Sequence, residues 1–428
     1  MRNLGNITLG DIVMIVVSKS KPLKGFVDIC GAKNAALPIM AACLAVDGCV
    51  SLENMPILSD TENMALIIES MGGRVDIREH NCTICCDGMK ETVAPEHLTR
   101  LLRGSFLVCG PLLARTGRAK VALPGGCRIG ARPVDLHIKG FVAMGAGVEY
   151  DNGYVILTAD SLKGSDIYLD FPSVGATENI LIAATLAKGR TVITNAATEP
   201  EVADLAVFLT KCGAIISGIG TEQLTVDGVE RLQGCAHMII GDRIEAGTYM
   251  IASAISGGDV TLKGADITSL NPVISKLREM GVQVNEENRC LRVIGGELNT
   301  VNIKTMPHPG FPTDMQAQFS ALMCVAKGTG VITETVFENR FMHISELMRM
   351  QADITIDGRN AVISGKKLLT GCKVTTQDLR GGAALVIAGL AAEGTTYVEK
   401  SSLIDRGYEN FVPKLQSLGA EIEYRKKC

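Results

Sequence analysis

The chain has 428 residues, of which 46% are hydrophobic, 21% charged and 4% aromatic, with no tryptophan. These values are ordinary for globular proteins and exclude an intrinsically disordered chain, a collagen and a coiled coil. At about 150 residues per domain, the length predicts two or three domains, with cores built from Ala, Val, Ile, Leu and Met.

Charge and hydropathy exclude two classes of partner. The 42 basic and 46 acidic side chains give a net charge of −4, so no domain-scale basic surface is available to coat a nucleic acid. Apolar runs such as residues 12–17 are too short to span a membrane or to form the core of a signal peptide. We therefore expect a cytoplasmic protein with neither nucleic-acid nor membrane partners.

Two glycine-centred phrases recur with a period of about 70 residues. One joins a helical stretch to a strand at Gly72, Gly145, Gly213, Gly281, Gln351 and Gly419, and the other ends a helix at Gly48, Gly117, Gly189, Gly258, Gly328 and Gly394. Glycine after a helix takes the left-handed conformation that ends it without a Cβ clash. The repeat predicts six small α/β units, grouped in two sets of three because single cores stop growing near about 250–300 residues. A ligand cleft is expected between the two sets.

The first segment that departs from the repeat is residues 31–38, GAKNAALP. A helix is expected to begin near Asn34, and backbone amides at a helix start favour an anion, to which Lys33 adds positive charge. A plain strand-to-helix turn is the alternative, and the glycine spacing of a Walker A loop is missing.

Fourteen cysteines are scattered through mostly apolar segments, and most are expected to be reduced and buried. Cys82, Cys85 and Cys86 form the one local group, which lacks the second pair of ligands that zinc needs. Residues 82–85 are interpreted as an alternating strand. Cys127 differs, because it lies among glycines and prolines in residues 123–137, next to Arg128 and near Arg132. This placement predicts a reactive thiol on an exposed loop, with an incidental loop cysteine as the alternative.

Residues 307–318, PHPGFPTDMQAQ, are predicted to stay extended until Thr313, which can cap the next helix. Asp314 then lies in the first turn, where it either complements the helix dipole or acts as a general base toward a substrate hydroxyl. Arg340, Arg380 and Arg406 each precede a predicted helix and neighbour an acid. Singly they indicate ion pairs, and together they would form a site for phosphate or carboxylate.

These segments, in this order on a six-unit repeat, resemble the UDP-N-acetylglucosamine enolpyruvyl transferases over about residues 27–423. The motifs that carry the resemblance are GAKNAALP, PGGCRIGARPVDLH, FPSVGATEN, FPTDMQAQF, TETVFENRFMH and IDRGYE. The resemblance implies the inside-out, barrel-like α/β fold, with six repeated units in two domains of three. One domain is expected to comprise residues 1–32 and 242–428, and the other residues 33–241 with the cysteine loop. The active site is expected in the cleft between them.

The resemblance also implies an activity, namely transfer of the enolpyruvyl group of phosphoenolpyruvate to the 3-hydroxyl of UDP-N-acetylglucosamine. This addition–elimination releases phosphate and is the first committed step of peptidoglycan synthesis. Cys127, the expected target of fosfomycin, matches the general acid, and Asp314 matches the base. Lys33 and Arg406 match further catalytic groups. The phosphoenolpyruvate-binding set is Lys33, Asn34, Arg132 and Arg406, and the UDP-sugar set is Arg103, Arg132, Pro133, Val134, Asp135, Leu136, Ser173, Val174, Asp314 and Val336.

No metal or cofactor is expected, and the oligomeric state stays open. Arg128 and Phe171 stand where relatives commonly have other residues, and neither change removes a catalytic group. Two alternatives remain: a related enolpyruvyl transferase with another acceptor, and a catalytically silent duplicate that binds the UDP-sugar and regulates.

Overall fold

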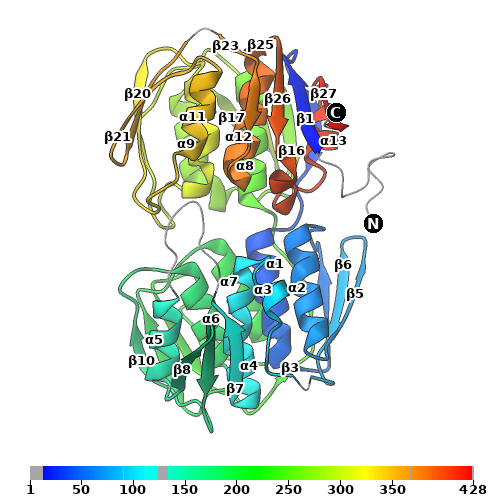
Figure 1. Ribbon diagram of the computed structural model, residues 1–428, viewed down its shortest axis with the longest axis vertical. Coiled ribbons are helices and arrows are strands. Elements are labelled where there is room, and N and C mark those ends of the chain that lie inside the picture. Colours follow the sequence, from blue (N-terminus) through cyan, green and yellow to red (C-terminus); the bar gives the residue numbers. More distant parts are fainter. Residues whose placement is uncertain (1–12, 90, 124–133, 367, 427–428) are drawn as a thin grey trace. The chain divides into compact units, whose positions relative to one another are not determined.

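The structure is a computed structural model that describes residues 13–89, 91–123, 134–366 and 368–426. These residues divide into two compact units (Figure 1). The terminal unit holds residues 13–29 and 242–426, and the central unit holds residues 30–123 and 134–241. Within the described residues, no helix has the length and apolar character needed to cross a membrane.

Three four-stranded sheets form the outer layer of the terminal unit, in the orders β17-β18-β16-β2, β19-β20-β22-β21 and β24-β26-β1-β27. In the third sheet, β1 from the start of the chain pairs antiparallel with β26 and β27 from its end, as the blue and red strands in Figure 1 show. The strands are β1 (Val13–Ser18), β2 (Lys24–Asp28), β16 (Asp259–Lys263), β17 (Gln283–Glu287), β18 (Cys290–Ile294), β19 (Ile303–Lys304), β20 (Thr329–Thr333), β21 (Asp353–Asp357), β22 (Asn360–Ser364), β24 (Lys373–Thr375), β26 (Thr395–Glu399) and β27 (Ile422–Lys426), with β23 (Leu369–Thr370) pairing with β25 (Ala392–Glu393).

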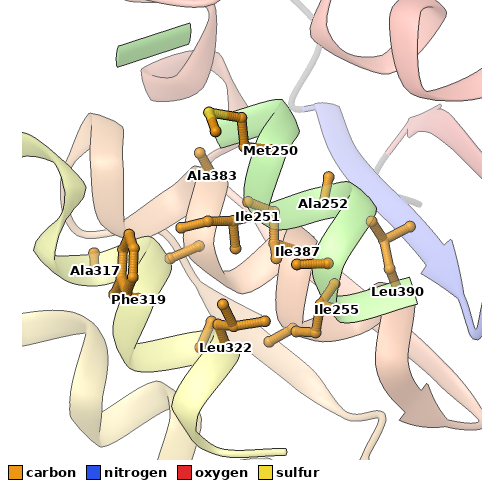
Figure 2. Packing of buried hydrophobic residues seen from close by; sticks show 14 of the residues in the cluster. Met250, Ile251, Ala252, Ile255, Ala317, Phe319, Leu322, Ala383, Ile387 and Leu390 are labelled. Atoms are coloured by element: carbon orange, nitrogen blue, oxygen red, sulfur yellow. The ribbon is translucent and has the colours of Figure 1, made fainter. Parts of the chain in front are cut away.

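Helices fill the core of the terminal unit. The three buried helices α8 (Arg243–Ser256), α10 (Gln316–Met323) and α12 (Leu379–Ala391) pack on one another, and Figure 2 shows side chains from all three meeting in the core. Because α12 is rich in Ala and Gly and is buried continuously from Arg380 to Leu390, its neighbours approach closely without any tryptophan in the core. The outer helices are α9 (Asn271–Glu279), α11 (Met342–Arg349) and α13 (Phe411–Ser417).

The central unit repeats this plan. Its sheets run β15-β4-β6-β5, β7-β9-β8 and β10-β11-β13-β12, and Val93 adds a parallel bridge beside Lys120 of β7. Its buried helices are α1 (Lys33–Ala42), α4 (Cys109–Thr116) and α6 (Val174–Ala184), and the others are α2 (Ser59–Ser70), α3 (Glu96–Thr99), α5 (Asp135–Ala143) and α7 (Pro200–Lys211). The strands are β3 (Val46–Asp47), β4 (Cys49–Glu53), β5 (Arg74–Arg78), β6 (Asn81–Cys85), β7 (Arg118–Ala122), β8 (Gly147–Asp151), β9 (Tyr154–Thr158), β10 (Asp166–Tyr168), β11 (Arg190–Thr194), β12 (Ile215–Ser217), β13 (Gln223–Asp227), β14 (Leu232–Gln233) and β15 (Ala236–Met238).

The six sheets share one pairing scheme. In five of them, one strand makes a parallel pairing on one side and an antiparallel pairing on the other, and the last pairing is antiparallel again. In the three-stranded sheet β7-β9-β8 both strand pairings are antiparallel, and the single bridge of Val93 takes the place of the parallel one. Three sheets with their helices belong to each unit. The predicted six-fold α/β repeat in two sets of three is therefore confirmed.

Backbone geometry explains the period. All six anchor positions of the first phrase have positive φ, from 68° at Gln351 to 102° at Gly213. In the second phrase only Gly117 ends its helix in the left-handed conformation, as predicted. The expectation is wrong for Gly48, Gly189, Gly328 and Gly394, which have positive φ but follow helices that end earlier, on Cys43, Thr185, Cys324 and Ala392. It is also wrong for Gly258, because α8 ends on Gly257 in the left-handed conformation. Gly258 is required for another reason: a Cβ there would lie 2.4 Å from the Leu23 carbonyl oxygen.

The cysteine-rich stretch is a strand, as predicted, and β6 ends at Cys85. Cys85 lies directly opposite Cys49 of β4, and the two form a disulfide with an S–S distance of 2.00 Å. This bond was not predicted from the sequence. Ten other cysteines in the described part of the chain are free thiols, and within that part no group of three or more metal-ligating side chains is assembled.

Candidate functional site

Asp314 lies in a 3-10 turn, Thr313–Met315, that leads into α10. The preceding residues are extended, as the prolines predicted, and Pro312 has φ −70° and ψ 130°. The prediction that Thr313 caps the helix is wrong. Its hydroxyl instead donates to Glu334 Oε2 at 2.8 Å, because this buried carboxylate lies within reach.

Two buried arginines hold the Asp314 carboxylate. Arg340 Nη2 lies 2.7 Å from Oδ1 and Arg380 Nη2 lies 3.2 Å from Oδ2. The arginine side chains are 4% and 3% exposed, while Asp314 is 26% exposed. Such charge-assisted contacts stabilise the ionised carboxylate and fix its orientation. The expected convergence of Arg340 and Arg380 is therefore present, with a carboxylate of the protein itself at its centre.

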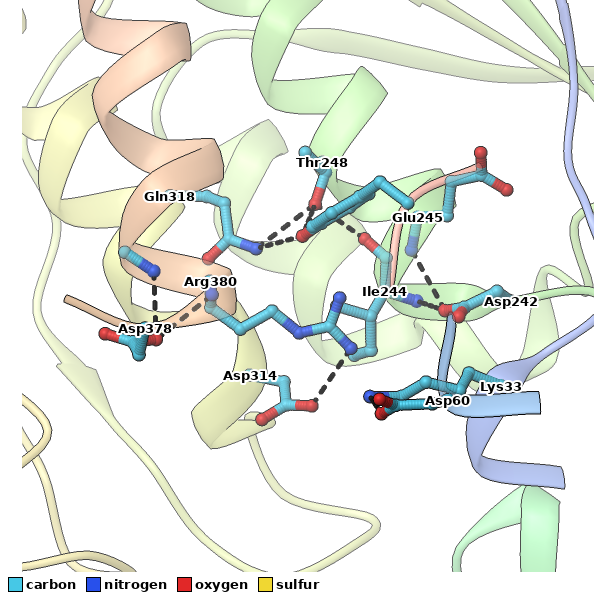
Figure 3. A network of polar contacts seen from close by, with 12 residues as sticks. Lys33, Asp60, Asp242, Ile244, Glu245, Thr248, Asp314, Gln318, Asp378 and Arg380 are labelled. Atoms are coloured by element: carbon cyan, nitrogen blue, oxygen red, sulfur yellow. Dashed lines mark hydrogen bonds and ion pairs between the residues drawn. The ribbon is translucent and has the colours of Figure 1, made fainter. Parts of the chain in front are cut away.

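Arg380 is held in place by polar contacts other than its ion pair with Asp314 (Figure 3). Arg380 is the second residue of α12, rather than part of a preceding loop, and the Asp378 carboxylate caps that helix by accepting from the Arg380 and Gly381 amides. The guanidinium lies 5.1 Å from the centre of the Tyr408 ring. Burial opposes the charge of Arg380, but Tyr408 and Asp314 outweigh it and raise the pKa of the guanidinium.

Tyr408 is itself held by a buried hydrogen-bond network. Its hydroxyl lies 2.9 Å from Thr248 Oγ1, and Gln318 Nε2 donates to both oxygens at 3.1 and 3.2 Å. Burial raises the pKa of Tyr408, so the ring stays neutral beneath Arg380. Residues from α8, α10 and the segment before α13 thus orient one guanidinium toward Asp314.

Glu334 joins the loop of Val336 to the Asp314 turn. Its Oε1 accepts from the Val336 amide and from Thr305 Oγ1, both at 2.8 Å, while Oε2 accepts from Thr313. The structure therefore brings the predicted Val336 and Asp314 segments together. Arg406, the third predicted arginine, is half-buried and ends the 3-10 helix Ser401–Arg406 of the same unit.

In the central unit, α1 begins at Lys33, one residue before the predicted start, and Asn34 follows in its first turn. Lys33 Nζ donates to Asp60 Oδ2 at 3.2 Å, and both side chains are largely buried. Gly31 is fixed by close approach, because a Cβ there would lie 1.8 Å from the Asn54 carbonyl oxygen. The turn before α1 therefore has its glycine for steric reasons, and Lys33 is positioned by a carboxylate.

Asn179 of α6 connects the predicted UDP-sugar residues of the central unit. Its Nδ2 donates to the Phe106 carbonyl oxygen at 2.9 Å and to His137 Nδ1 at 3.0 Å. Phe106 belongs to the 3-10 helix that begins at Arg103, and His137 lies in the first turn of α5. Burial and the positive charge of Arg103 lower the pKa of His137 to about 4, so the imidazole is neutral and accepts this bond.

The same α6 carries two further predicted residues at its start. Ser173 caps the helix, with its hydroxyl 3.4 Å from the Ala176 amide, and Val174 is the first helical residue. Val134 precedes α5, and Asp135 and Leu136 begin it. The structure thus gathers six predicted positions around α6: Arg103, Val134, Asp135, Leu136, Ser173 and Val174.

Three predicted residues lie outside the described part of the chain: Cys127, Arg132 and Pro133. The sequence reasoning also missed groups that position the predicted ones, above all Asn179, Asp60 and Tyr408. Asn179 and Tyr408 stand inside the motifs FPSVGATEN and IDRGYE, which was the available signal. Asp60 is marked only as an acid in the first turn of α2.

Comparison with known proteins places these residues in context. The model of the family described as EPSP synthase (3-phosphoshikimate 1-carboxyvinyltransferase) matches residues 17–415. UDP-N-acetylglucosamine 1-carboxyvinyltransferase 1 of Caldanaerobacter subterraneus subsp. tengcongensis is 53% identical over 412 residues, 96% of this chain and 99% of that protein. UDP-N-acetylglucosamine 1-carboxyvinyltransferase 2 of Carboxydothermus hydrogenoformans is 51% identical over 411 residues, 95% of this chain and 98% of that protein.

Solved structures share the fold at lower identity. The enolpyruvyl transferase NikO from Streptomyces tendae superposes with a TM-score of 0.89 and 23% identity over 98% of this chain and all of that one. An EPSP synthase from Acinetobacter baumannii superposes with a TM-score of 0.77 and 20% identity over 97% of this chain and 100% of that one. The expected fold class is confirmed.

Proposed function

The chain belongs to the EPSP synthase family of carboxyvinyltransferases, and on that premise we propose that it transfers the enolpyruvyl group of phosphoenolpyruvate to the 3-hydroxyl of UDP-N-acetylglucosamine. The choice of UDP-N-acetylglucosamine as the acceptor is supported by 53% identity, over nearly the whole chain, to a protein named for that activity. The chain is a transferase, and its reaction starts peptidoglycan synthesis.

We propose that Asp314 is the general base. The two guanidinium groups leave its carboxylate ionised and oriented, and its exposed quarter leaves room for a substrate hydroxyl to approach an oxygen lone pair. The base takes the proton of the sugar 3-hydroxyl as that oxygen attacks C2 of phosphoenolpyruvate. Once protonated, Asp314 loses most of its attraction to Arg340 and Arg380, which favours return of the proton.

Cys127 is proposed as the acid that delivers a proton to C3 of phosphoenolpyruvate, as its position in the PGGCRIGARPVDLH motif implies. Addition of the proton and of the sugar oxygen across the double bond gives a tetrahedral phosphate ester. Loss of phosphate from C2 and of one proton from C3 then restores the double bond in the product. The acid therefore acts on C3 of phosphoenolpyruvate, while the base acts on the sugar hydroxyl that attacks the neighbouring C2.

Cations are proposed to hold the anionic phosphoenolpyruvate. Lys33 is supported by Asp60, and Asn34, Arg132 and Arg406 complete the set. Arg380 Nε and Nη1 are buried and have no hydrogen-bond partner among the described residues. Because buried donors are nearly always satisfied, these two nitrogens are consistent with a nearby anion in the working enzyme. Preorganised charge of this kind is commonly the largest catalytic contribution.

The UDP-sugar is proposed to bind the residues gathered around α6, and Asp314 and Val336 are proposed as further contacts. Asn179 positions this set, since one side chain fixes both Phe106 and His137. We propose that the enzyme works in the cytoplasm, which is supported by ten free thiols against one disulfide among the described residues.

The acceptor is tested by measuring phosphate release from phosphoenolpyruvate with each of two acceptors. UDP-N-acetylglucosamine should support turnover, and shikimate 3-phosphate should not. Release only with shikimate 3-phosphate would assign the chain to the other branch of its family. Tight binding of UDP-N-acetylglucosamine without release would instead identify a silent, UDP-sugar-binding duplicate.

A further inference from the structure

Two thiols of the central unit lie in contact without being bonded. Cys212, at the end of α7, and Cys235, directly before β15, have their Sγ atoms 3.4 Å apart. The backbone holds both in place, because the Gln233 amide donates to the Cys212 carbonyl at 2.8 Å and the Ser51 amide donates to the Cys235 carbonyl at 2.9 Å. Only a small side-chain movement separates this arrangement from a disulfide, whose S–S distance is about 2.05 Å.

The two thiols differ in accessibility. Cys212 is 2% exposed, whereas Cys235 is half-buried and open to small reagents. Exposed Lys211 lies next to Cys212 in the chain, and its Nζ is 3.2 Å from His237 Nδ1. A reagent therefore reaches Cys235 first, with Cys212 directly behind it.

The charge environment favours the Cys235 thiolate. The hydrogen bond from the Cys212 thiol, aided by the positive charge of Lys211, lowers the pKa of Cys235 despite partial burial. The same hydrogen bond and burial raise the pKa of Cys212, which stays protonated as the donor. An accessible thiolate beside a protonated thiol is the arrangement found in oxidation-sensing cysteine pairs.

We propose that Cys235 and Cys212 form an oxidation site that reacts with hydroperoxides and closes to a reversible disulfide. In the first step the Cys235 thiolate attacks the terminal peroxide oxygen, the O–O bond breaks, and an alkoxide or hydroxide leaves and takes a proton from water. Cys235 is then a sulfenic acid. In the second step Cys212 attacks that sulfur, the S–O bond breaks, and the hydroxyl leaves with the thiol proton as water. The two sulfurs lose two electrons in total and the peroxide gains them, and a dithiol reductant reverses the disulfide.

Other thiols of the described chain are poor competitors. Burial raises the pKa of Cys43, Cys109 and Cys324, which disfavours their reactive thiolates. Cys43 is also a charge neighbour of Cys235, but its thiol donates to the Ile39 carbonyl at 3.3 Å. Cys235 and Cys212 are therefore favoured over the other thiols because their sulfur atoms are close together and because the pKa of Cys235 is lowered.

The polar contacts around the pair allow the bond to form in the folded protein. Asp204 of α7 accepts from the Ile240 amide at 3.3 Å and lies 3.1 Å from His237 Nε2. Helix α7 and the segment that follows Cys235 are thus already one packed block, and the disulfide adds a covalent link within it. No unfolding step is needed before the two sulfurs meet.

The test is peptide mapping of the full, folded chain, with the Cys49–Cys85 disulfide intact and the other described cysteines as free thiols, after treatment with hydrogen peroxide, followed by alkylation and trypsin digestion without reductant. Cleavage after Lys211, Arg231 and Arg243 gives peptides 212–231 and 232–243, which the disulfide joins. We expect this linked pair to form about tenfold faster than oxidation of half-buried Cys290. Adding dithiothreitol should abolish it. The peptide with Cys127 is read separately in the same digest.

Three variants separate the steps. Cys212→Ser, or Cys212→Ala if serine impairs folding, should leave a Cys235 sulfenic acid that dimedone traps. Cys235→Ser should leave Cys212 unoxidised at the same dose, and the control Cys290→Ser should not change the linked pair. The proposal is overturned if the link forms only in urea, if Cys235 joins Cys43 instead, or if Cys290 oxidises first.

Discussion

Asp314→Asn probes the centre of the site, because it removes the charge while keeping the shape. The N–O distances of 2.7 and 3.2 Å to Arg340 and Arg380 put the charge centres about 4 Å apart, where each attraction is about 4 kcal/mol at an effective dielectric constant near 20. Desolvation offsets part of this, and loss of one partner from a buried pair costs about 3–5 kcal/mol. Since Asp314 is 26% exposed, we expect the lower end, about 3 kcal/mol of unfolding free energy.

Urea unfolding measures that loss, and Asp259→Asn is the matched control. Asp259 pairs with Arg292 through two hydrogen bonds of 2.9 and 2.8 Å, but on the surface, where such pairs are worth less than about 1 kcal/mol. Phosphate release measures the other consequence: Asp314→Asn should lower kcat by about 10²–10⁴, and Asp259→Asn should not lower it. A stability loss no larger than that of the control would refute the electrostatic reasoning. A kcat within tenfold of the parent would refute the general-base role.

Three further predictions concern binding, backbone conformation and pH. Lys33→Gln should raise the KM for phosphoenolpyruvate about 10–100-fold, the value of one charge-assisted hydrogen bond, and steady-state kinetics that show an unchanged KM would exclude Lys33 from the anion site. Gln351→Gly should raise the unfolding free energy by about 0.5–1 kcal/mol, because Gln351 has φ 68°, which glycine adopts without strain. The reverse change, Gly419→Gln, should lower the unfolding free energy by about 1–2 kcal/mol, and the same change in both variants would contradict this prediction. Burial lowers the pKa of His343 to about 4, below its ordinary 6.5, so unfolded chains bind a proton first as the pH falls. The unfolding free energy should therefore drop by roughly 3 kcal/mol from this group between pH 6.5 and 4, and urea titrations of His343→Gln that keep the full slope would contradict it.

The fold was predictable because each repeated unit needs a residue with positive φ at the same place, and glycine usually fills that place. One helix of each unit is followed by a left-handed residue, which is glycine in five of the six units, and the even spacing of these positions reveals the six units. Gln351 shows the limit of the rule, since the backbone stays left-handed there without glycine. Gly257 and Gly258 show a second limit of the rule. Gly257 ends a helix and Gly258 avoids a clash with the nearby backbone, and the sequence alone does not tell these two roles apart.

The site was predictable where a residue's chemistry is local and not where it depends on distant partners. Asp314 was identified from the sequence because it is an acid that follows a proline-rich segment. Its ion pairs with Arg340 and Arg380 were not predictable in the same way, because these arginines lie 26 and 66 positions further along the chain. Asn179 stands in the motif FPSVGATEN, but its positioning role was not predictable, because its partners Phe106 and His137 come from other segments of the chain. The contact between Cys212 and Cys235 escaped notice for the same reason, as did the disulfide between Cys49 and Cys85.

The central claim, enolpyruvyl transfer to the UDP-sugar by addition and elimination, is tested most directly by mass analysis of the product formed in heavy water. With phosphoenolpyruvate and UDP-N-acetylglucosamine, the account predicts a UDP-sugar that gains one enolpyruvyl group carrying deuterium at C3, because C3 is protonated from an exchangeable acid before it loses a proton. An unchanged UDP-sugar, or an enolpyruvyl product without deuterium at C3, would contradict it.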